Sequence, residues 1–398
     1  MKCNSIRPEK NKNELMKITN VEAFILQSPF EITLPEGSDE ARGVKHCLLI
    51  KVSTDEGITG WSDVETAPHV GEAVVNAPES GMGVFEGLRT LVIGEDPFDV
   101  ERLWDKIYRG SIYYGRRGVA IQVLSGFDIA CHDIMGKAIG RPVHKLLGGA
   151  RRDKIRAYAS TLFRSTPDDM KRACEFYMKR GFTAVKFGWG VFGQDFRRDV
   201  KLVAAAREAL GPDIDLMVDP GWMVERSAYD AIELCKALEP YNIFWLEDFL
   251  HPEAYDAYAR VKAAGVKTRL AAGEQEATGW GFRELIRRGC IDVAQPDLSR
   301  CGGFTQARKI IWEAEYAGID VCPHAWLTDL LTAASLHVNA VLPRSLFLEY
   351  NVSDNPMLRE VIRNPVQMDA EGFIPVPQGN GLGIEINEAA VKKFCINL

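Results

Sequence analysis

Polar side chains recur at the ends of short apolar runs in the second half of this 398-residue sequence. From the second of them on, successive spacings are 28, 27, 23, 27 and 25 residues, about one strand–helix unit each. Barrel enzymes gather such strand-end residues at one rim, where their active sites lie. Each residue alone also fits a turn or a helix cap, but the regular spacing favours one shared site. The set is Lys186, Asp219, Glu247, Glu274, Asp297, His324 and Glu349.

Two kinds of chemistry follow from these residue types. Asp219, Glu247 and Glu274 are consecutive carboxylates, and hard oxygen ligands suit Mg²⁺. Zinc prefers histidine or cysteine, and neither residue occupies those three ends. Asp297 and His324 then form an acid–histidine pair, in which the carboxylate fixes the tautomer and the other ring nitrogen accepts a proton. The sequence therefore predicts a magnesium site beside a general base.

The elements that must position these residues are strands alternating with helices. Eight short apolar runs between residues 149 and 355 are separated by helical patterns, which predicts a (β/α)8-type barrel of class α/β. A doubly wound parallel sheet is the alternative. The Gly-rich phosphate loop that usually follows the first strand of such a sheet is absent.

The remaining segments predict a second, smaller unit. Residues 16–148 read as an α+β capping domain, with strands at 17–26 and 46–64 and helices at 99–109 and 120–137. The turn signal "TDEG" divides the second strand segment into a hairpin. Residues 356–398 are rich in turns and are expected to pack back on the capping domain. Residues 1–15 resemble a disordered extension or an alternative start.

The composition argues against some classes of partner and indicates a cellular compartment. The formal net charge is −7 without a long basic run, which argues against nucleic acid. No apolar stretch approaches the roughly 20 residues of a membrane span, and the start lacks the apolar core of a secretory signal. Nine cysteines without a C-x-x-C pair indicate free thiols in a reducing compartment, so we expect a cytoplasmic protein.

The sequence resembles the enolase superfamily, and within it the mandelate racemase subgroup, from about Met16 to the C-terminus. The resemblance is carried, in order, by "VLSGFDIACHDIMGKAIGRPVHKLLGG", "MVDPGW", "WLED", "QPDLSRCGG", "PHA" and "LEY". It implies Mg²⁺ on Asp219, Glu247 and Glu274, and a general base in the His324–Asp297 dyad. It also implies that Glu349 hydrogen-bonds the substrate carboxylate, and that the protein is a homo-oligomer, often an octamer.

The sequence departs from the subgroup after the second barrel strand. The subgroup usually has Lys-x-Lys there, with the second lysine as a base; here Lys186 matches the first, and Gly188 stands in place of the second. Lys186 is then expected to be an electrostatic aid. Racemisation needs groups on both faces, whereas β-elimination works with His324 alone.

We therefore expect a sugar-acid dehydratase, acting on a pentonate, hexonate or 6-deoxyhexonate and giving a 2-keto-3-deoxy acid. A diacid such as galactarate is a further alternative, if a front-domain arginine binds the far carboxylate. A racemase or epimerase is the alternative within the family. A metal-dependent barrel hydrolase would need a His-x-His near the first barrel strand, which "RAYAS" does not offer. A non-catalytic barrel would not be expected to keep a complete triad and dyad.

Candidate substrate contacts come from the front domain and the barrel rim. Lys186, Trp189, Arg42 and Lys45 are the chosen candidates, with Glu65 and Thr66 as further ones. The front-domain residues fit plain surface as well, and Phe187 fits core packing. The segment "YYGRRG" at 113–118 fits either a pocket wall or a subunit contact.

Overall fold

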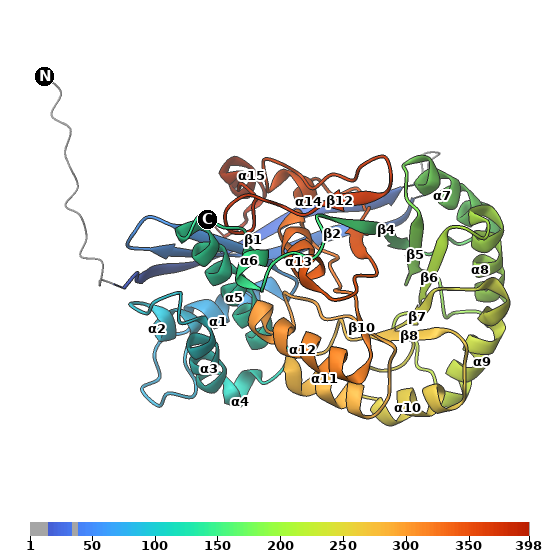
Figure 1. Cartoon of the computed structure of the whole chain (residues 1–398), viewed down its shortest axis with the longest axis horizontal. Coiled ribbons are helices and arrows are strands. Elements are labelled where there is room, and N and C mark those ends of the chain that lie inside the picture. Colours follow the sequence, from blue (N-terminus) through green and yellow to red (C-terminus); the bar gives the residue numbers. More distant parts are fainter. Residues whose placement is uncertain (1–14, 34–38, 398) are drawn as a thin grey trace, which may run out of the picture.

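The computed structural model describes residues 15–33 and 39–397, which form a capping part and a barrel (Figure 1). The capping sheet is antiparallel, in the order β1 (Ile18–Thr33), β2 (Asp39–Thr54) and β3 (Thr59–Val64). The predicted hairpin is confirmed, because β2 and β3 pair across the "TDEG" turn. Both β1 and β2 are longer than predicted. Residues 1–14 of the predicted extension lie outside the described residues, as does the side chain of Arg42.

Helices cover one face of this sheet. Inward apolar side chains from β1–β3 pack against α5 (Val119–Ala138) in one core. This long helix also contacts the barrel helix α12 (Gly303–Ala317), so most residues of α5 are buried. The sequence pattern placed α3 and α5 within one residue of their observed bounds. The capping helices are α1 (Pro68–Asn76), α2 (Leu88–Val92), α3 (Val100–Gly110), α4 (Ile112–Gly115), α5 (Val119–Ala138) and α6 (Val143–Leu146).

The eight predicted barrel strands are all present and parallel. They pair in chain order, which excludes the doubly wound alternative, and a parallel bridge between Val321 and Ser345 links the two edges. The strands are β4 (Lys154–Leu162), β5 (Ala184–Gly188), β6 (Asp215–Asp219), β7 (Trp245–Glu247), β8 (Arg269–Ala272), β9 (Val293–Ala294), β10 (Asp320–Val321) and β11 (Leu348–Asn351).

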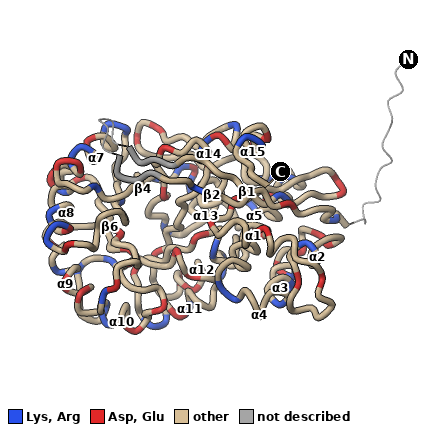
Figure 2. The backbone as a smooth tube through the Cα atoms, turned by 180° about the vertical axis from the view of Figure 1, so that it is seen from behind, with Lys and Arg blue, Asp and Glu red and all other residues tan. Residues whose placement is uncertain are grey.

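Amphipathic helices form the outer ring around these strands, as Figure 1 shows. Their inward faces pack on the outward side chains of the strands in one large core. Basic and acidic residues are both distributed along these helices (Figure 2). The helices are α7 (Pro167–Lys179), α8 (Phe196–Leu210), α9 (Ala228–Leu238), the 3₁₀ turn η1 (Glu239–Tyr241), α10 (Tyr255–Ala263), α11 (Thr278–Arg287), α12 (Gly303–Ala317) and α13 (Asp329–Val341).

The C-terminal segment joins the two parts. Its elements are α14 (Pro356–Glu360), β12 (Phe373–Pro375) and α15 (Glu388–Phe394). The strand β12 pairs antiparallel with β4 of the barrel, and the backbone N–H of Ile396 donates to the carbonyl of Ile25 in β1 at 2.9 Å. The segment therefore completes the capping part, as expected. Among the described helices, none combines the length and apolar character that a membrane span requires.

Candidate active site

The barrel interior is built in layers, and the layer nearest the rim is polar. An apolar layer comes first, formed by Tyr158, Ala184, Met217, Trp245, Ala271, Val293, Cys322 and Phe347. Because side chains alternate along a strand, the residues two positions further point inward as well. These are Ser160, Lys186, Asp219, Glu247, Gly273, Gln295, His324 and Glu349. Five of the seven predicted site residues therefore lie in one ring, and Glu274 and Asp297 follow just beyond it.

Lys186 lies among the carboxylates of this ring. Its ammonium pairs with Glu247, and its Nζ lies 3.0 Å from Glu349 Oε1 and 3.8 Å from Asp219 Oδ2. Burial alone would lower the pKa of Lys186, but the carboxylates of Glu247 and Glu349 raise it well above its usual value. The neighbouring carboxylates therefore favour the charged form of Lys186.

Glu349 is held from three sides. Its Oε1 accepts from Ser160 Oγ at 2.8 Å, and its Oε2 accepts from the backbone N–H of Ala325 at 2.7 Å. Burial favours the neutral acid, but Lys186 and His324 lower the pKa of Glu349 to about 2. Glu349 is thus ionised here and only accepts hydrogen bonds. Its expected hydrogen bond to a substrate carboxylate stays a prediction.

Asp219, Glu247 and Glu274 offer a donor set that fits a hard divalent cation. Burial and the neighbouring Glu247 raise the pKa of Asp219 well above its usual value, which marks uncompensated negative charge. The adjacent Asp248 adds a buried Oδ2 without a hydrogen-bond partner among the described residues. All donors are oxygens, the preference of Mg²⁺ rather than zinc. These residues would hold such an ion.

His324 and Asp297 form the predicted dyad. His324 Nδ1 lies 2.6 Å from Asp297 Oδ2, and Asp297 Oδ1 accepts from the backbone and hydroxyl of Ser299 at 2.6 and 2.7 Å. The other ring nitrogen, Nε2, lies 2.9 Å from Glu274 Oε2. Burial opposes the charged ring, but the carboxylates of Glu349 and Glu274 raise the pKa of His324 well above its usual value. The neighbouring carboxylates therefore favour the imidazolium form of the ring here, with Nε2 facing Glu274.

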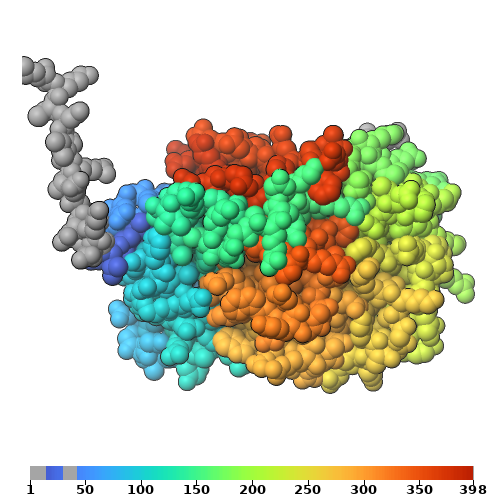
Figure 3. Space-filling view, in the orientation of Figure 1, coloured from blue at the N-terminus to red at the C-terminus, as the bar shows by residue number. Residues whose placement is uncertain are grey.

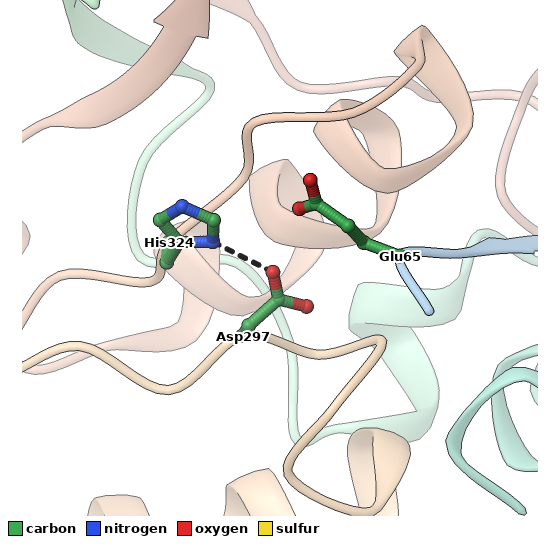
Figure 4. Close-up of side chains that lie close together, drawn as sticks. All are labelled: Glu65, Asp297 and His324. Atoms are coloured by element: carbon green, nitrogen blue, oxygen red, sulfur yellow. Dashed lines mark hydrogen bonds and ion pairs between the residues drawn. The ribbon is translucent and has the colours of Figure 1, made fainter. Parts of the chain in front are cut away.

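Glu65 of the capping part lies beside this dyad. Glu65, Asp297 and His324 bring three potential metal-ligand atoms within 4.8 Å of one another (Figure 4). However, Glu65 is paired with Lys45 Nζ at 2.5 Å and with Arg300 Nη2 at 2.7 Å. Burial favours the neutral acid, but these two cations hold the pKa of Glu65 below its usual value. Glu65 is thus already neutralised by two cations, and the metal site on the three strand-end carboxylates stays the prediction.

A cavity of about 560 Å³ opens above the polar ring. Lys186, Asp219, Glu274, His324 and Glu349 line its floor, and Val44, Leu162, Trp189 and Trp326 are its apolar lining residues. The volume and the mixture of apolar walls with a few convergent charges are typical of a small-molecule site.

The candidate substrate contacts divide into two groups. Lys45, Glu65 and Trp189 line the cavity. Thr66 instead donates its hydroxyl to Gln122 at 2.5 Å, and Phe187 is buried against Phe163 in the barrel core. The segment 113–118 does not line this cavity; residues 113–117 line a separate hollow on the outer surface.

Three residues of the site escaped the sequence analysis. Ser160 and Gln295 lie in the polar ring, and counting two residues past each inward apolar residue would have found both. Arg300 stands in the quoted motif "QPDLSRCGG", but its contact with Glu65 depends on how the capping part docks. No pattern within the barrel sequence indicates the contact between Arg300 and Glu65.

Comparisons with known proteins agree with this geometry. The family described as "Mandelate racemase / muconate lactonizing enzyme, N-terminal domain" matches residues 20–148, and "Enolase C-terminal domain-like" matches residues 169–390. D-galactarolactone cycloisomerase of Agrobacterium fabrum is 34% identical over 395 residues, covering 95% of this chain and 99% of that protein. D-galactonate dehydratase of Ralstonia pickettii is 34% identical over 359 residues, covering 86% of this chain and 90% of that protein.

A solved structure shares the whole architecture. The 3,6-anhydro-D-galactonate cycloisomerase of Zobellia galactanivorans superposes with a TM-score of 0.83 at 28% identity, covering 96% of this chain and all of that chain. The two matched families and the near-complete coverage agree with the eight-stranded barrel and its capping sheet. The chain belongs to the enolase superfamily, in the group of mandelate racemase and muconate lactonizing enzyme.

Proposed function

We propose that this protein is a Mg²⁺-dependent carbon–oxygen lyase that dehydrates a sugar acid to a 2-keto-3-deoxy acid. The substrate is an aldonate such as a pentonate, hexonate or 6-deoxyhexonate. The relatives named as dehydratases of galactonate, arabinonate and rhamnonate support the substrate class. The eight cysteines that the structure describes are all free thiols, which supports a cytoplasmic enzyme.

The proposal depends mainly on the glycine at position 188. It lines the cavity where the subgroup usually has its second base, and a Cβ built there would lie 2.8 Å from Asp219 Oδ2. The position therefore offers no base and leaves little room for one. Lys186 acts in this proposal as a positive charge, so the His324–Asp297 dyad is the base that remains on the polar ring. One base suits β-elimination, whereas racemisation or epimerisation needs a group on each face.

Each residue of the site has a separate role in the proposed elimination. His324 accepts the proton alpha to the carboxylate at Nε2, because Nδ1 is bonded to Asp297. Asp297 then stabilises the imidazolium, which donates its proton to the departing 3-oxygen. Lys186 offers positive charge near the substrate carboxylate. A divalent ion on Asp219, Glu247 and Glu274 would supply the further positive charge that an enediolate requires.

A cycloisomerase is the second candidate. Its specific support is that two near-full-length relatives are named as cycloisomerases of a sugar lactone and an anhydro sugar acid. The same proton abstraction with a ring oxygen as the leaving group would open the ring without losing water. Trp189 and Trp326 line the cavity, and Lys45 Nζ lies 5.0 Å from the centroid of the Trp326 ring.

The experiment is a screen of the purified protein with Mg²⁺ against open-chain sugar acids and their cyclic forms. Keto-acid formation is detected with semicarbazide, and product masses distinguish the candidates. A product 18 Da lighter than the substrate, the mass of one lost water, supports the dehydratase, whereas an isomer of a cyclic substrate supports the cycloisomerase.

The matched variant is His324→Asn, which preserves a polar side chain but removes the base. We expect it to bind Mg²⁺ and keep its fold while turnover falls at least about 1,000-fold. Substantial turnover in this variant would contradict the role given to the dyad. Exchange of the alpha proton for deuterium with inversion at that carbon, and without elimination, would favour an epimerase.

A further inference from the structure

The barrel strands before the dyad are too short to hold its two residues. β9 and β10 pair with each other at two positions, and the last of them joins Val321 to Ala294. Asp297 and His324 each lie three residues beyond the end of these strands. The parallel ladder therefore ends before the dyad, and the positions of both side chains depend on contacts that their loops make.

The capping strand β3 contacts both loops. Asp63, near its end, accepts two hydrogen bonds at Oδ2, from the backbone N–H of Thr328 at 3.0 Å and from the Thr328 hydroxyl at 2.6 Å. Glu65 directly follows β3, and Figure 4 shows it beside the dyad. Its backbone N–H donates to Ser299 Oγ at 3.4 Å, and Ser299 donates to Asp297 Oδ1 at 2.7 Å. One strand end thus reaches the loops of both dyad residues.

The loop from His324 to Thr328 is tied at each end. At its start, the backbone N–H of Ala325 donates to Glu349 Oε2 at 2.7 Å. At its end, Thr328 is the N-cap of α13, and its hydroxyl accepts from a backbone N–H in the first turn of that helix while it donates to Asp63. Thr328 is fully buried. Because the loop is short, a shift of Thr328 would move His324.

The loop of Asp297 has further contacts with the capping part. In Figure 3 the teal capping segments directly adjoin the orange barrel segments. The indole N–H of Trp104 donates to the carbonyl of Gly302 at 3.0 Å, and the backbone N–H of Gly302 donates to Ser125 Oγ at 2.8 Å. Gly302 follows Asp297 closely in the chain, so α3 and α5 also hold that loop. Loss of the Asp63 contact should therefore displace His324 more than Asp297.

Asp63 is a costly residue to place at this contact. Its side chain is 1% exposed, and no ion pair joins it to a lysine, arginine or histidine that the structure describes. Burial raises the pKa of Asp63 to about 7, against the opposing effect of the two bonds from Thr328. A buried carboxylate without a cation partner lowers the stability of a fold. The contact is therefore not explained by a gain in stability, and its place at the end of the His324 loop gives a different reason.

A second buried carboxylate of the capping part makes a different set of contacts. Asp133 on α5 is 2% exposed, accepts from the backbone N–H groups of Trp61 and Leu382 at 3.2 and 2.9 Å, and pairs with Lys137 at 2.6 Å. These contacts fasten the C-terminal segment to the capping part. None of the four residues is among those that line the active-site cavity. Asp133 is thus a structural carboxylate of similar burial.

We propose that Asp63 is a positioning residue, which through Thr328 holds the loop of His324 at the distance from Asp297 that the dyad requires. Asp63 is not among the residues that line the cavity, so it acts through the loop and not on the substrate. The proposal rests on the proposed function in one respect, the role of His324 as the base. The position of the dyad itself can be measured without a substrate.

The test compares crystal structures and kinetics of the full-length wild type and Asp63→Ala. In the variant we expect residues 324–328 to be displaced, with His324 Nδ1 out of hydrogen-bond distance of Asp297, while Asp297 keeps its bonds to Ser299. On a substrate found by the screen, kcat should fall about 100-fold with KM changed less than about threefold, because a catalytic group displaced by about 1 Å loses rate by such a factor. If no substrate is found, the proposed function fails, whereas the crystal structures still decide the role of Asp63.

Three further variants separate positioning from general stability. Asp63→Asn keeps an oxygen that can accept both bonds, so its dyad geometry and kcat should stay close to those of the wild type. Asp133→Ala should lower the free energy of unfolding in urea but leave kcat and the dyad unchanged. If Asp63→Ala does not fold, Thr328→Val removes the hydroxyl bond from the other side, and kcat should fall about tenfold.

Two outcomes would overturn the proposal. The first is a wild-type distance between His324 and Asp297 in Asp63→Ala, or in Thr328→Val if that variant replaces it. The second is a loss of kcat in Asp133→Ala as large as that in Asp63→Ala, which would show that Asp63 acts through the stability of the capping part alone.

Discussion

Arg300 and Glu65 join the barrel to the capping part directly beside the dyad. Arg300 Nη2 lies 2.7 Å from Glu65 Oε2, while its Nη1 donates to the carbonyl of Glu274 at 3.1 Å. Its Nε lies 3.9 Å from Asp297 Oδ2. One guanidinium therefore faces the front wall of the cavity, a proposed metal ligand and the dyad.

Replacing Arg300 should disturb stability and turnover together. Arg300→Gln would leave Glu65 with Lys45 alone and remove a positive charge near Asp297 and Glu274. Loss of one partner of a buried ion pair costs on the order of 3 kcal/mol of unfolding free energy. We expect that loss in urea titrations, with kcat/KM reduced at least about 100-fold.

Two further variants separate a role in the site from general destabilisation. Arg300→Lys keeps the charge and should recover part of the activity. Arg288→Gln removes an exposed arginine that pairs with Asp256 and Glu284, and it should change neither quantity measurably. An Arg300→Gln enzyme with wild-type kcat/KM would show that the contact only fastens the capping part.

Glu247 tests the assignment of the metal site. It is fully buried, and its carboxylate contacts Lys186 and accepts from Trp245 Nε1 at 2.8 Å. Glu247→Gln removes one of three ligand charges while it keeps the side-chain shape. We expect Mg²⁺ affinity measured by calorimetry to fall at least about 100-fold, with turnover falling in parallel. The exposed Glu253→Gln on the following loop is the control, and equal affinities in both variants would mean that the ion binds elsewhere.

We predict that replacing Gln295 by an apolar residue raises the stability of the protein and lowers its activity. Its side chain is buried in the polar ring, and neither amide atom has a hydrogen-bond partner among the described residues. An unpaired buried amide costs about 1–3 kcal/mol, so Gln295→Met, of similar shape, should raise the free energy of unfolding by roughly that amount. Because the amide lies among the site residues, we expect turnover to fall about tenfold or more. Unchanged stability would mean that ordered water already satisfies the amide.

The sequence predicted the barrel because parallel strands buried on both faces appear as short apolar runs, each closed by a polar residue. The same feature located Asp219, Glu247 and Glu274. It did not reveal Gln295, because a glutamine after Ala294 looks like any polar residue at the start of a loop. Lys45, Glu65 and Arg300 meet only after β2, β3 and the barrel rim dock. Pairing across 235 residues between Glu65 and Arg300 leaves no local periodicity to detect.

We predict that the buried His337 makes the folded protein less stable at acidic pH. It lies on α13, where its Nε2 donates to the carbonyl of Leu382 at 3.1 Å and its Nδ1 accepts from the backbone N–H of His144 at 3.3 Å. A second proton would have to enter at Nδ1 and break that contact. Burial, together with the neighbouring His144, lowers the pKa of His337 to about 4.

The sign of the effect follows from proton binding. The unfolded chain has a histidine pKa of about 6.5, so between about pH 6.5 and pH 4 it binds more protons than the folded protein. Stability is therefore complete above about pH 6.5 and falls as the pH decreases towards 4, by about 3 kcal/mol in all for this one residue. At pH 5 the loss should be about 2 kcal/mol relative to pH 7.5.

Urea titrations at pH 5 and pH 7.5 measure this difference directly. His337→Gln keeps a donor for Leu382 but does not titrate, so the part of the pH dependence due to His337 should disappear even if the variant is less stable at both pH values. His251→Gln, at an exposed position, should retain the wild-type dependence. If His337→Gln keeps the full wild-type loss between the two pH values, other groups cause the acid sensitivity and the buried histidine pair does not.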